Sequence, residues 1–358
     1  MRHLLLSFIL LFSSSVLFAQ APKYSNEFLS IGVGARSLGM SGSVVGSTED
    51  VTSGYWNPAG LNGIHSDMQV GLMHSEYFAG IAKFDYGSMA KRIDSSSVFG
   101  VSLVRFGIDD IPNTIELIDP SGNINYDRIS TFSAADYAFM FHYARKTSIP
   151  GLQLGATAKI VHRRIGDFAR SWGFGIDVAA QYRKGNWRFG AVARDITTTF
   201  NAWSYSLSDE MITTFLQTGN EIPTNSIELT LPKLLLGAGR VFRIKENFSV
   251  LGEFGFDCSF DGKRNTLIKS NFVSIDPHFG FEAGYKNIVF LRGGMGNVQR
   301  SMRIDQSGNE TTFQPNIGIG VRIKRFAIDY ALTDIGDQSV AQYSNVFSLR
   351  FDIHKAGS

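Results

Sequence analysis

The stretch 151–163 reads Gly-Leu-Gln-Leu-Gly-Ala-Thr-Ala-Lys-Ile-Val-His-Arg and alternates apolar and polar side chains. Successive side chains of a β-strand point to opposite faces, so this stretch predicts a strand with one apolar face and one polar face. The apolar face carries Leu152, Leu154, Ala156, Ala158 and Ile160, and the polar face carries Gln153, Gly155, Thr157, Lys159 and Arg163. The pattern therefore predicts a strand between two different surroundings.

The same alternation returns along the chain from Asp67 onward, in about fourteen segments. Residues 248–257, 316–323 and 347–353 are clear examples. A soluble sandwich also alternates in this way, so alternation does not decide between the two architectures. Many of the segments reach about ten residues, however, and soluble strands usually have five or six. Strand length therefore favours an antiparallel outer-membrane β-barrel.

The connections between the predicted strands alternate in length, as they do in outer-membrane barrels. Short polar turns are predicted at 91–94, 183–186, 245–247, 286–287 and 324–325. Longer links are predicted at 107–130, 196–226, 258–269, 297–310 and 334–342. We expect the short turns on the periplasmic side and, with an even number of strands, both ends of the barrel there. Aromatic residues near strand ends fit the girdles of a membrane barrel: Tyr182, Trp187, Tyr285, Phe326 and Tyr330.

The composition agrees with an all-β membrane protein and excludes other classes. The chain has 37 Gly, 29 Phe and only 18% charged residues, against about 25% in soluble proteins. A net charge of +2 without a basic run argues against a nucleic-acid partner. The single cysteine, Cys258, rules out an intramolecular disulfide and a cysteine-based zinc cluster.

The first residues have the features of an export signal. Arg2 and His3 precede an apolar run at 4–18, and Ala19-Gln20-Ala21 provides small residues for cleavage. The alternative is an uncleaved anchor, but the run is shorter than the roughly 20 residues that span a bilayer. We therefore predict a cleaved signal peptide at 1–21 and location in the cell outer membrane.

Residues 22–66 differ from the rest of the chain because they are rich in glycine and turns. We predict that they form an N-terminal plug inside the lumen, and that 67–358 form the barrel. The sequence Gly34-Ala35-Arg36-Ser-Leu-Gly39-Met40, followed by Trp56-Asn57-Pro58-Ala59-Gly60, resembles the start of PorV/PorQ family proteins, barrels of the FadL-like superfamily. The resemblance implies that these motifs fold inside a fourteen-stranded barrel.

Charged residues of the plug are expected to meet polar residues on the inner barrel face. Arg36, Glu49 and Asp50 are the candidates in the plug. The candidate lumen residues are Lys159, Arg163, Glu253, Arg322 and Arg350. For any single pair, the alternative is that both residues are ordinary solvated charges.

Two functions remain open on this evidence. The resemblance to PorV/PorQ proteins implies a role in or beside type IX secretion of Bacteroidetes-type bacteria, with translocon subunits or secreted cargo bearing C-terminal sorting domains as partners. Trp203 and Tyr205, in a long link, would then be extracellular loop contacts. The alternative is a FadL-like channel for uptake of apolar small molecules, which the polar inner faces weaken. Outer-membrane lipid is the partner common to both.

No pattern in the sequence predicts an enzyme, a cofactor site or a metal site. Gly32, Gly34 and Gly39 do not form a dinucleotide fingerprint, because the position three after Gly34 is Ser37. The seven histidines lack the spacing of zinc motifs. A catalytic serine near His142 or His162 is the remaining enzymatic alternative.

Overall fold

The computed structural model describes residues 25–117, 123–302, 308–335 and 343–354. The predicted signal peptide lies outside the described residues. Within them, fourteen antiparallel strands form one sheet that closes when the last strand pairs with the first, Met68 opposite Ile353. This confirms the predicted fold class. No helix in the described ranges is long and apolar enough to cross a membrane.

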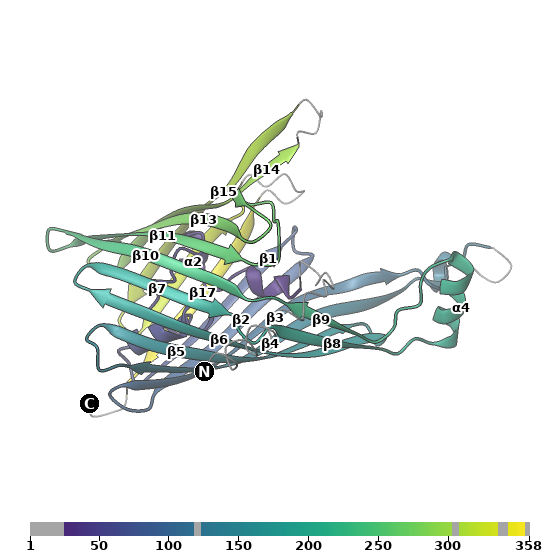
Figure 1. Cartoon of the computed structure of the whole chain (residues 1–358), viewed down its shortest axis with the longest axis horizontal. Helices are drawn as coiled ribbons and strands as arrows, with labels where there is room; N and C mark the ends of the chain where they lie inside the picture. The colour runs from purple at the N-terminus through teal and green to yellow at the C-terminus, as the bar shows by residue number, and fades with distance from the viewer. Residues whose placement is uncertain (1–24, 118–122, 303–307, 336–342, 355–358) are drawn as a thin grey trace, which may run out of the picture.

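The barrel strands follow one another in chain order around the wall (Figure 1). They are β1 (Met68–Tyr77), β2 (Ala82–Arg92), β3 (Ser97–Asn113), β4 (Ser130–Lys146), β5 (Leu152–Ile165), β6 (Ala169–Lys184), β7 (Trp187–Arg194), β10 (Lys233–Ile244), β11 (Phe248–Ser259), β13 (Ser274–Tyr285), β14 (Val289–Met302), β15 (Asn309–Ile323), β16 (Phe326–Thr333) and β17 (Ser344–Ile353).

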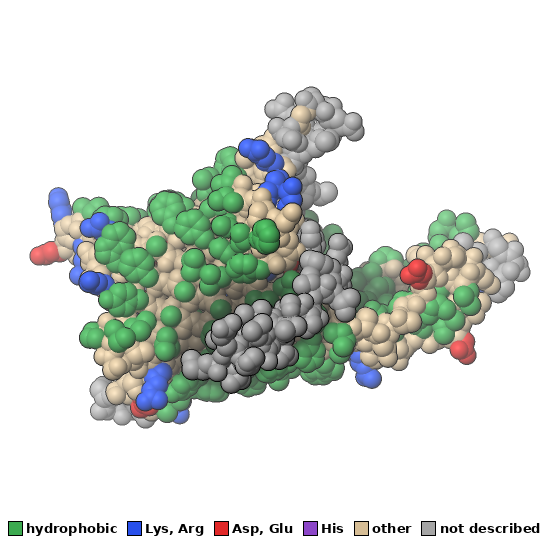
Figure 2. Space-filling view, viewed as in Figure 1, with side chains coloured by type: hydrophobic (Ala, Val, Ile, Leu, Met, Phe, Trp, Pro, Cys, Tyr) green, Lys and Arg blue, Asp and Glu red, His purple; other side chains and the backbone are tan. Residues whose placement is uncertain are grey.

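The alternating pattern separates a lipid-facing surface from the lumen. On β5, Lys159 and Val161 are buried inside the barrel, whereas Leu154 and Ile160 are exposed on the outer face. Apolar side chains are spread over the visible outer wall, and charged side chains lie toward its two ends (Figure 2). Closure is required there, because lipid cannot satisfy the hydrogen bonds of an open sheet edge.

The two ends of the barrel differ in their connections. Short turns join β2–β3, β6–β7, β10–β11, β13–β14 and β15–β16 close to the predicted positions. The strict alternation of length is wrong, however, because 78–81 and 166–168 are also short and lie at the opposite end. Backbone in the left-handed region at Phe78, Ala79 and Gly166 allows these tight turns. The ends of β1 and β17 lie beside the short turns, which we assign to the periplasmic side.

The link predicted at 196–226 is largely regular structure. It contains β8 (Thr199–Tyr205), α4 (Asp209–Thr218) and β9 (Ser226–Thr230). These elements extend the wall away from the short turns, because β8 pairs with the first residues of β6, 169–174, and β9 pairs with β8. A further short strand, β12 (Ile268–Lys269), pairs with β13, and the 3-10 turn η3 (Tyr126–Arg128) precedes β4. Trp203 and Tyr205 therefore lie on β8 and not in a loop.

The described part of the predicted plug, 25–66, has no strand. It contains η1 (Glu27–Ser30), α2 (Ala35–Gly39), α3 (Ser53–Trp56) and η2 (Pro58–Gly63), enclosed by the wall (Figure 1). Nearly all of its side chains are buried, including Val33, Met40 and Leu61. The plug consequently takes the place of a hydrophobic core.

A charge placed on the lipid face will test the assignment of this surface. Val178 lies mid-strand on the outer face of β6, and Tyr182 lies on the same face near the turn. We expect Val178→Arg to lower the free energy of unfolding by about 2–4 kcal/mol and Tyr182→Arg by about 0–1 kcal/mol. Guanidinium titration of the protein refolded into lipid vesicles measures both. Equal costs at the two depths would contradict the membrane assignment.

Candidate functional site

Each charged plug residue singled out in the sequence forms an ion pair with the wall. Asp50 pairs with Arg350 on β17, as expected. Arg36 pairs with Glu282 on β13 through two bonds of 2.8 and 3.0 Å between guanidinium nitrogens and carboxylate oxygens. Glu49 pairs with Arg183 on β6 at 3.0 Å. Glu282 and Arg183 were not predicted, because which strand faces which part of the plug depends on long-range packing.

The pair between Arg36 and Glu282 belongs to a longer chain of charges. Arg292 on β14 donates to Glu282 at 2.7 Å and to Asp329 on β16 at 2.8 Å. Two positive and two negative groups thus alternate from the plug across three wall strands. Such charge-assisted bonds have strict geometry, so the chain fixes the orientation of α2 in the lumen.

The plug backbone also bonds to inward side chains of the wall. Glu253 accepts from the Gly46 amide at 2.6 Å, and Gln69 accepts from the Val51 amide at 2.7 Å. Gln181 donates to the Thr48 carbonyl at 2.8 Å. Because the plug has little regular structure, these side chains satisfy backbone groups that would otherwise be buried without partners.

The Trp56-Asn57-Pro58 motif holds the plug together from within. The Trp56 indole donates to the Val33 carbonyl at 2.8 Å. Asn57 is extended, and its amide donates to the carbonyls of Val45 and, on β6, Ala180. Pro58 starts η2, where its fixed φ suits a helical first turn. The motif therefore joins two plug segments to each other and to the wall.

Glycines of the wall allow the plug backbone to approach closely. A Cβ atom on Gly190 would lie 2.1 Å from the Val45 carbonyl oxygen, and one on Gly155 would lie 2.3 Å from the Ala59 nitrogen. Gly280 and Gly294 stand in the same relation to Met40. The sequence analysis did not use these strand glycines, although they could have indicated the plug contacts, since glycine within a strand often marks close backbone approach.

The five candidate lumen residues all belong to the inner face, but they have different surroundings. Lys159 is buried between Asp177 at 2.8 Å and Asp195 at 2.5 Å, and Arg163 pairs with Asp136 and Glu228. None of these ion pairs involves the plug. Glu253 and Arg350 contact the plug, whereas Arg322 has no acidic partner among the described residues. Trp203 donates to Glu228 and lies under the Arg163 guanidinium.

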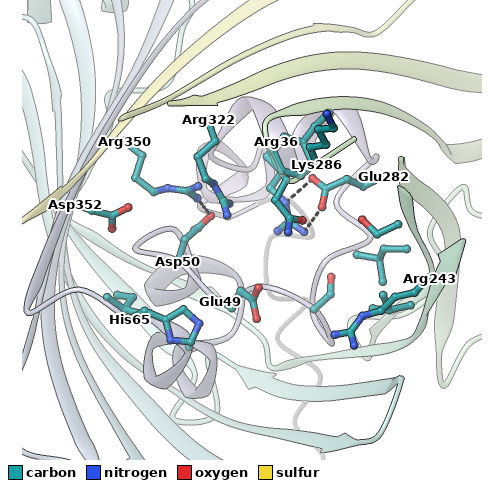
Figure 3. A pocket seen from close by; sticks show the side chains of 18 of the residues that line it. Arg36, Glu49, Asp50, His65, Arg243, Glu282, Lys286, Arg322, Arg350 and Asp352 are labelled. Atoms are coloured by element: carbon teal, nitrogen blue, oxygen red, sulfur yellow. Dashed lines mark hydrogen bonds and ion pairs between the residues drawn. The ribbon is translucent and has the colours of Figure 1, made fainter. Parts of the chain in front are cut away.

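Two cavities lie at opposite ends of the plug. The outer cavity, about 610 Å³, has apolar and aromatic plug residues in its lining, among them Leu38, Tyr55 and Trp56. The inner cavity, about 420 Å³, lies beside the short turns and has a strongly charged lining (Figure 3). An apolar cluster of plug and wall side chains adjoins the outer cavity: Phe28, Leu29, Val33, Leu38, Met40, Trp56, Met73, Tyr77, Phe84, Tyr86, Val104 and Met140.

Solved structures with the same fold are outer-membrane channels and transporters. The CymD monoaromatic hydrocarbon channel matches 91% of this chain and 98% of its own, with a TM-score of 0.57 and 12% identity. The Ralstonia pickettii toluene transporter TbuX matches 90% and 99%, with a TM-score of 0.55 and 14% identity. A Pseudomonas aeruginosa FadL homologue matches 90% and 98%, with a TM-score of 0.51 and 11% identity.

These similarities show the fold: a closed β-barrel like those of outer-membrane channels and transporters, a FadL homologue among them. No protein-family model and no curated protein matches it. The expected resemblance to PorV/PorQ proteins has no support from the comparisons.

The pair between Asp50 and Arg350 makes plug docking dependent on pH. Burial alone would raise the pKa of the Asp50 carboxyl, but Arg350 and Arg36 outweigh burial and hold that pKa below its ordinary value. Stabilisation by ionised Asp50 is therefore fully present above about pH 4 and is lost as the pH falls through the lowered pKa. Hydrogen exchange of the 50–60 amides should accelerate below that pH.

The variant Asp50→Asn should loosen the plug at neutral pH. It leaves Arg350 without its countercharge, which we expect to cost about 3 kcal/mol of plug docking. Glu49→Gln is the matched control, because the Glu49 side chain is 51% exposed and its pair should contribute no more than about 1 kcal/mol. Amide exchange of the plug compares the two variants. A larger effect of Glu49→Gln would contradict the assigned order.

A methyl group on a wall glycine should displace the plug. We expect Gly190→Ala to destabilise plug docking by about 1–3 kcal/mol, because its Cβ would overlap the Val45 carbonyl. Gly252→Ala is the control: Gly252 faces outward, and its Cβ would lie 3.8 Å from the Phe279 ring, an ordinary van der Waals distance. Limited proteolysis at the plug should increase in the first variant alone. Equal cleavage of the two variants would show that plug docking does not depend on the close approach of the plug backbone to Gly190.

Proposed function

We propose that this protein is a channel for uptake of apolar small molecules across the outer membrane, with the outer cavity as its first binding site. The observation that supports the proposal most is the patch of aromatic and aliphatic plug side chains within the mixed lining of the outer cavity, inside a barrel of this fold. The patch consists of Leu29, Ile31, Leu38, Tyr55 and Trp56. Similar barrels are described as a monoaromatic hydrocarbon channel and a toluene transporter, which supports a related ligand class here.

The charged inner face does not oppose an apolar ligand. Lys159, Arg163 and Glu253 are each engaged by wall or plug groups, so they do not form an open polar path. The apolar cluster then adjoins the cavity on the side of β1–β5. Because these three side chains are engaged, they present little free polarity to an apolar ligand.

The expected affinity is low, as a channel requires. A single-ring ligand that buries about 150 Å² of apolar surface gains about 4 kcal/mol at 25 cal/mol per Å². That value corresponds to a Kd of about 1 mM. Passage beyond the cavity requires the plug to shift, because the plug fills the lumen between the two cavities.

A charge in the apolar part of the outer cavity should abolish binding. Ile31 lines this cavity and packs against the apolar cluster. We expect Ile31→Glu to weaken binding of radiolabelled toluene to the purified protein at least about tenfold, since an apolar ligand cannot solvate the carboxylate. Uptake by outer-membrane vesicles should fall in parallel.

The matched control is Gln314→Glu, which adds the same charge on the polar side of the same cavity. Gln314 accepts a hydrogen bond from Asn297 at 2.7 Å, and a carboxylate retains that acceptor. Toluene binding should persist in this variant. Equal loss in both variants, or no saturable binding by the unmodified protein, would contradict the channel proposal.

Association with type IX translocon subunits or cargo stays a prediction. No contact within the described residues favours it over the channel. Mass spectrometry of proteins that copurify from outer membranes in mild detergent tests it: secreted proteins with C-terminal sorting domains would support that role.

A further inference from the structure

The inner cavity has an excess of positive charge. Among the described residues, seven Arg or Lys side chains and five Asp or Glu side chains line its roughly 420 Å³. The cavity lies at the periplasmic end, on the opposite side of the plug from the outer cavity. The outer cavity has the opposite balance, with three Arg or Lys and five Asp or Glu side chains among the described residues that line it.

Only some of the arginines that line the inner cavity have acidic partners. Arg36 and Arg350 are neutralised by Glu282 and Asp50. Within the described ranges, no carboxylate lies within 4.0 Å of the charged groups of three other lining residues, Arg188, Arg243 and Arg322. Figure 3 shows Arg322 entering the cavity between Arg350 and Arg36, and Arg243 entering from the opposite side.

Two of the unpaired guanidinium groups are held in place by other contacts. The Arg188 Nη1 donates to the carbonyls of Gly185 at 2.8 Å and Trp187 at 3.0 Å. The Arg322 guanidinium lies over the Phe290 ring, 5.4 Å from its centroid. These contacts orient the side chains without neutralising them, so the groups are preorganised for an external anion.

We propose that the inner cavity binds a small phosphate anion or phosphate ester that enters from the periplasm. Guanidinium groups match the paired oxygens of these anions. A water molecule occupies about 30 Å³ in the liquid, so the cavity has room for phosphate and for a larger organic anion. A bound anion relieves the electrostatic repulsion among these cations, and this relief favours binding.

The test is isothermal titration calorimetry of the full-length protein in neutral detergent at low salt. Inorganic phosphate and glycerol phosphate are titrated in separate experiments. We expect saturable binding that weakens at least tenfold in Arg322→Gln and in Arg243→Gln. Arg322→Lys should recover only part of the affinity, because it restores the charge but not the paired donors.

The matched control is Arg240→Gln on the same strand as Arg243. Arg240 faces outward and lies over the Trp187 ring, away from the cavity. Binding should be unchanged in this variant. Equal loss in Arg240→Gln, or full binding in Arg322→Gln and Arg243→Gln, would overturn the proposal.

The two ligands separate the possible sources of the anion. Tight binding of inorganic phosphate indicates a free periplasmic anion, whereas binding of glycerol phosphate alone indicates a lipid headgroup. Binding of neither overturns the site. Toluene binding at the outer cavity does not depend on any of these results, so the two proposals fail separately.

Discussion

Closure of the sheet is the constraint on which the rest of this structure depends. In lipid, every backbone group of the wall must find its partner in another strand, and pairing of β1 with β17 removes the last free edges. A closed wall of fourteen strands encloses more space than its own side chains fill. The N-terminal segment occupies that space. Its burial is thus a consequence of the strand number, and its irregular backbone is acceptable because it is shielded from lipid.

An irregular segment inside a barrel creates a second requirement, because its own backbone groups must be satisfied. The wall meets it with two devices that appear side by side. Glycines such as Gly155 and Gly190 let the plug backbone touch the sheet, and neighbouring polar side chains such as Glu253 and Gln181 reach over to bond it. Ion pairs then fix the orientation. Together they hold a segment that has no regular secondary structure long enough to be stable alone.

The sequence predicted the features that depend on local pattern. Period-two alternation identified the strands and placed Lys159 and Arg350 on the inner face, where the structure also has them. It did not predict that Arg36 meets Glu282, because that pairing depends on how the plug turns inside the closed wall. The sequence analysis also missed β8 and β9, since residues 199–205 become a strand only through pairing with residues 169–174 of β6. Local signals cannot report such long-range partners.

The distribution of charge gives the lumen a direction. On the outer side, the cavity lining combines aromatic and aliphatic plug side chains with charged groups, of which Asp195 is paired with Lys159. On the inner side, Arg322 and Arg243 face the cavity, and no described carboxylate forms an ion pair with either of them. The plug separates these two environments and is itself anchored by residues that border the charged one, Asp50 and Arg36. A change in charge at the inner cavity would therefore act on Asp50 and Arg36, the same residues that anchor the plug between the two cavities.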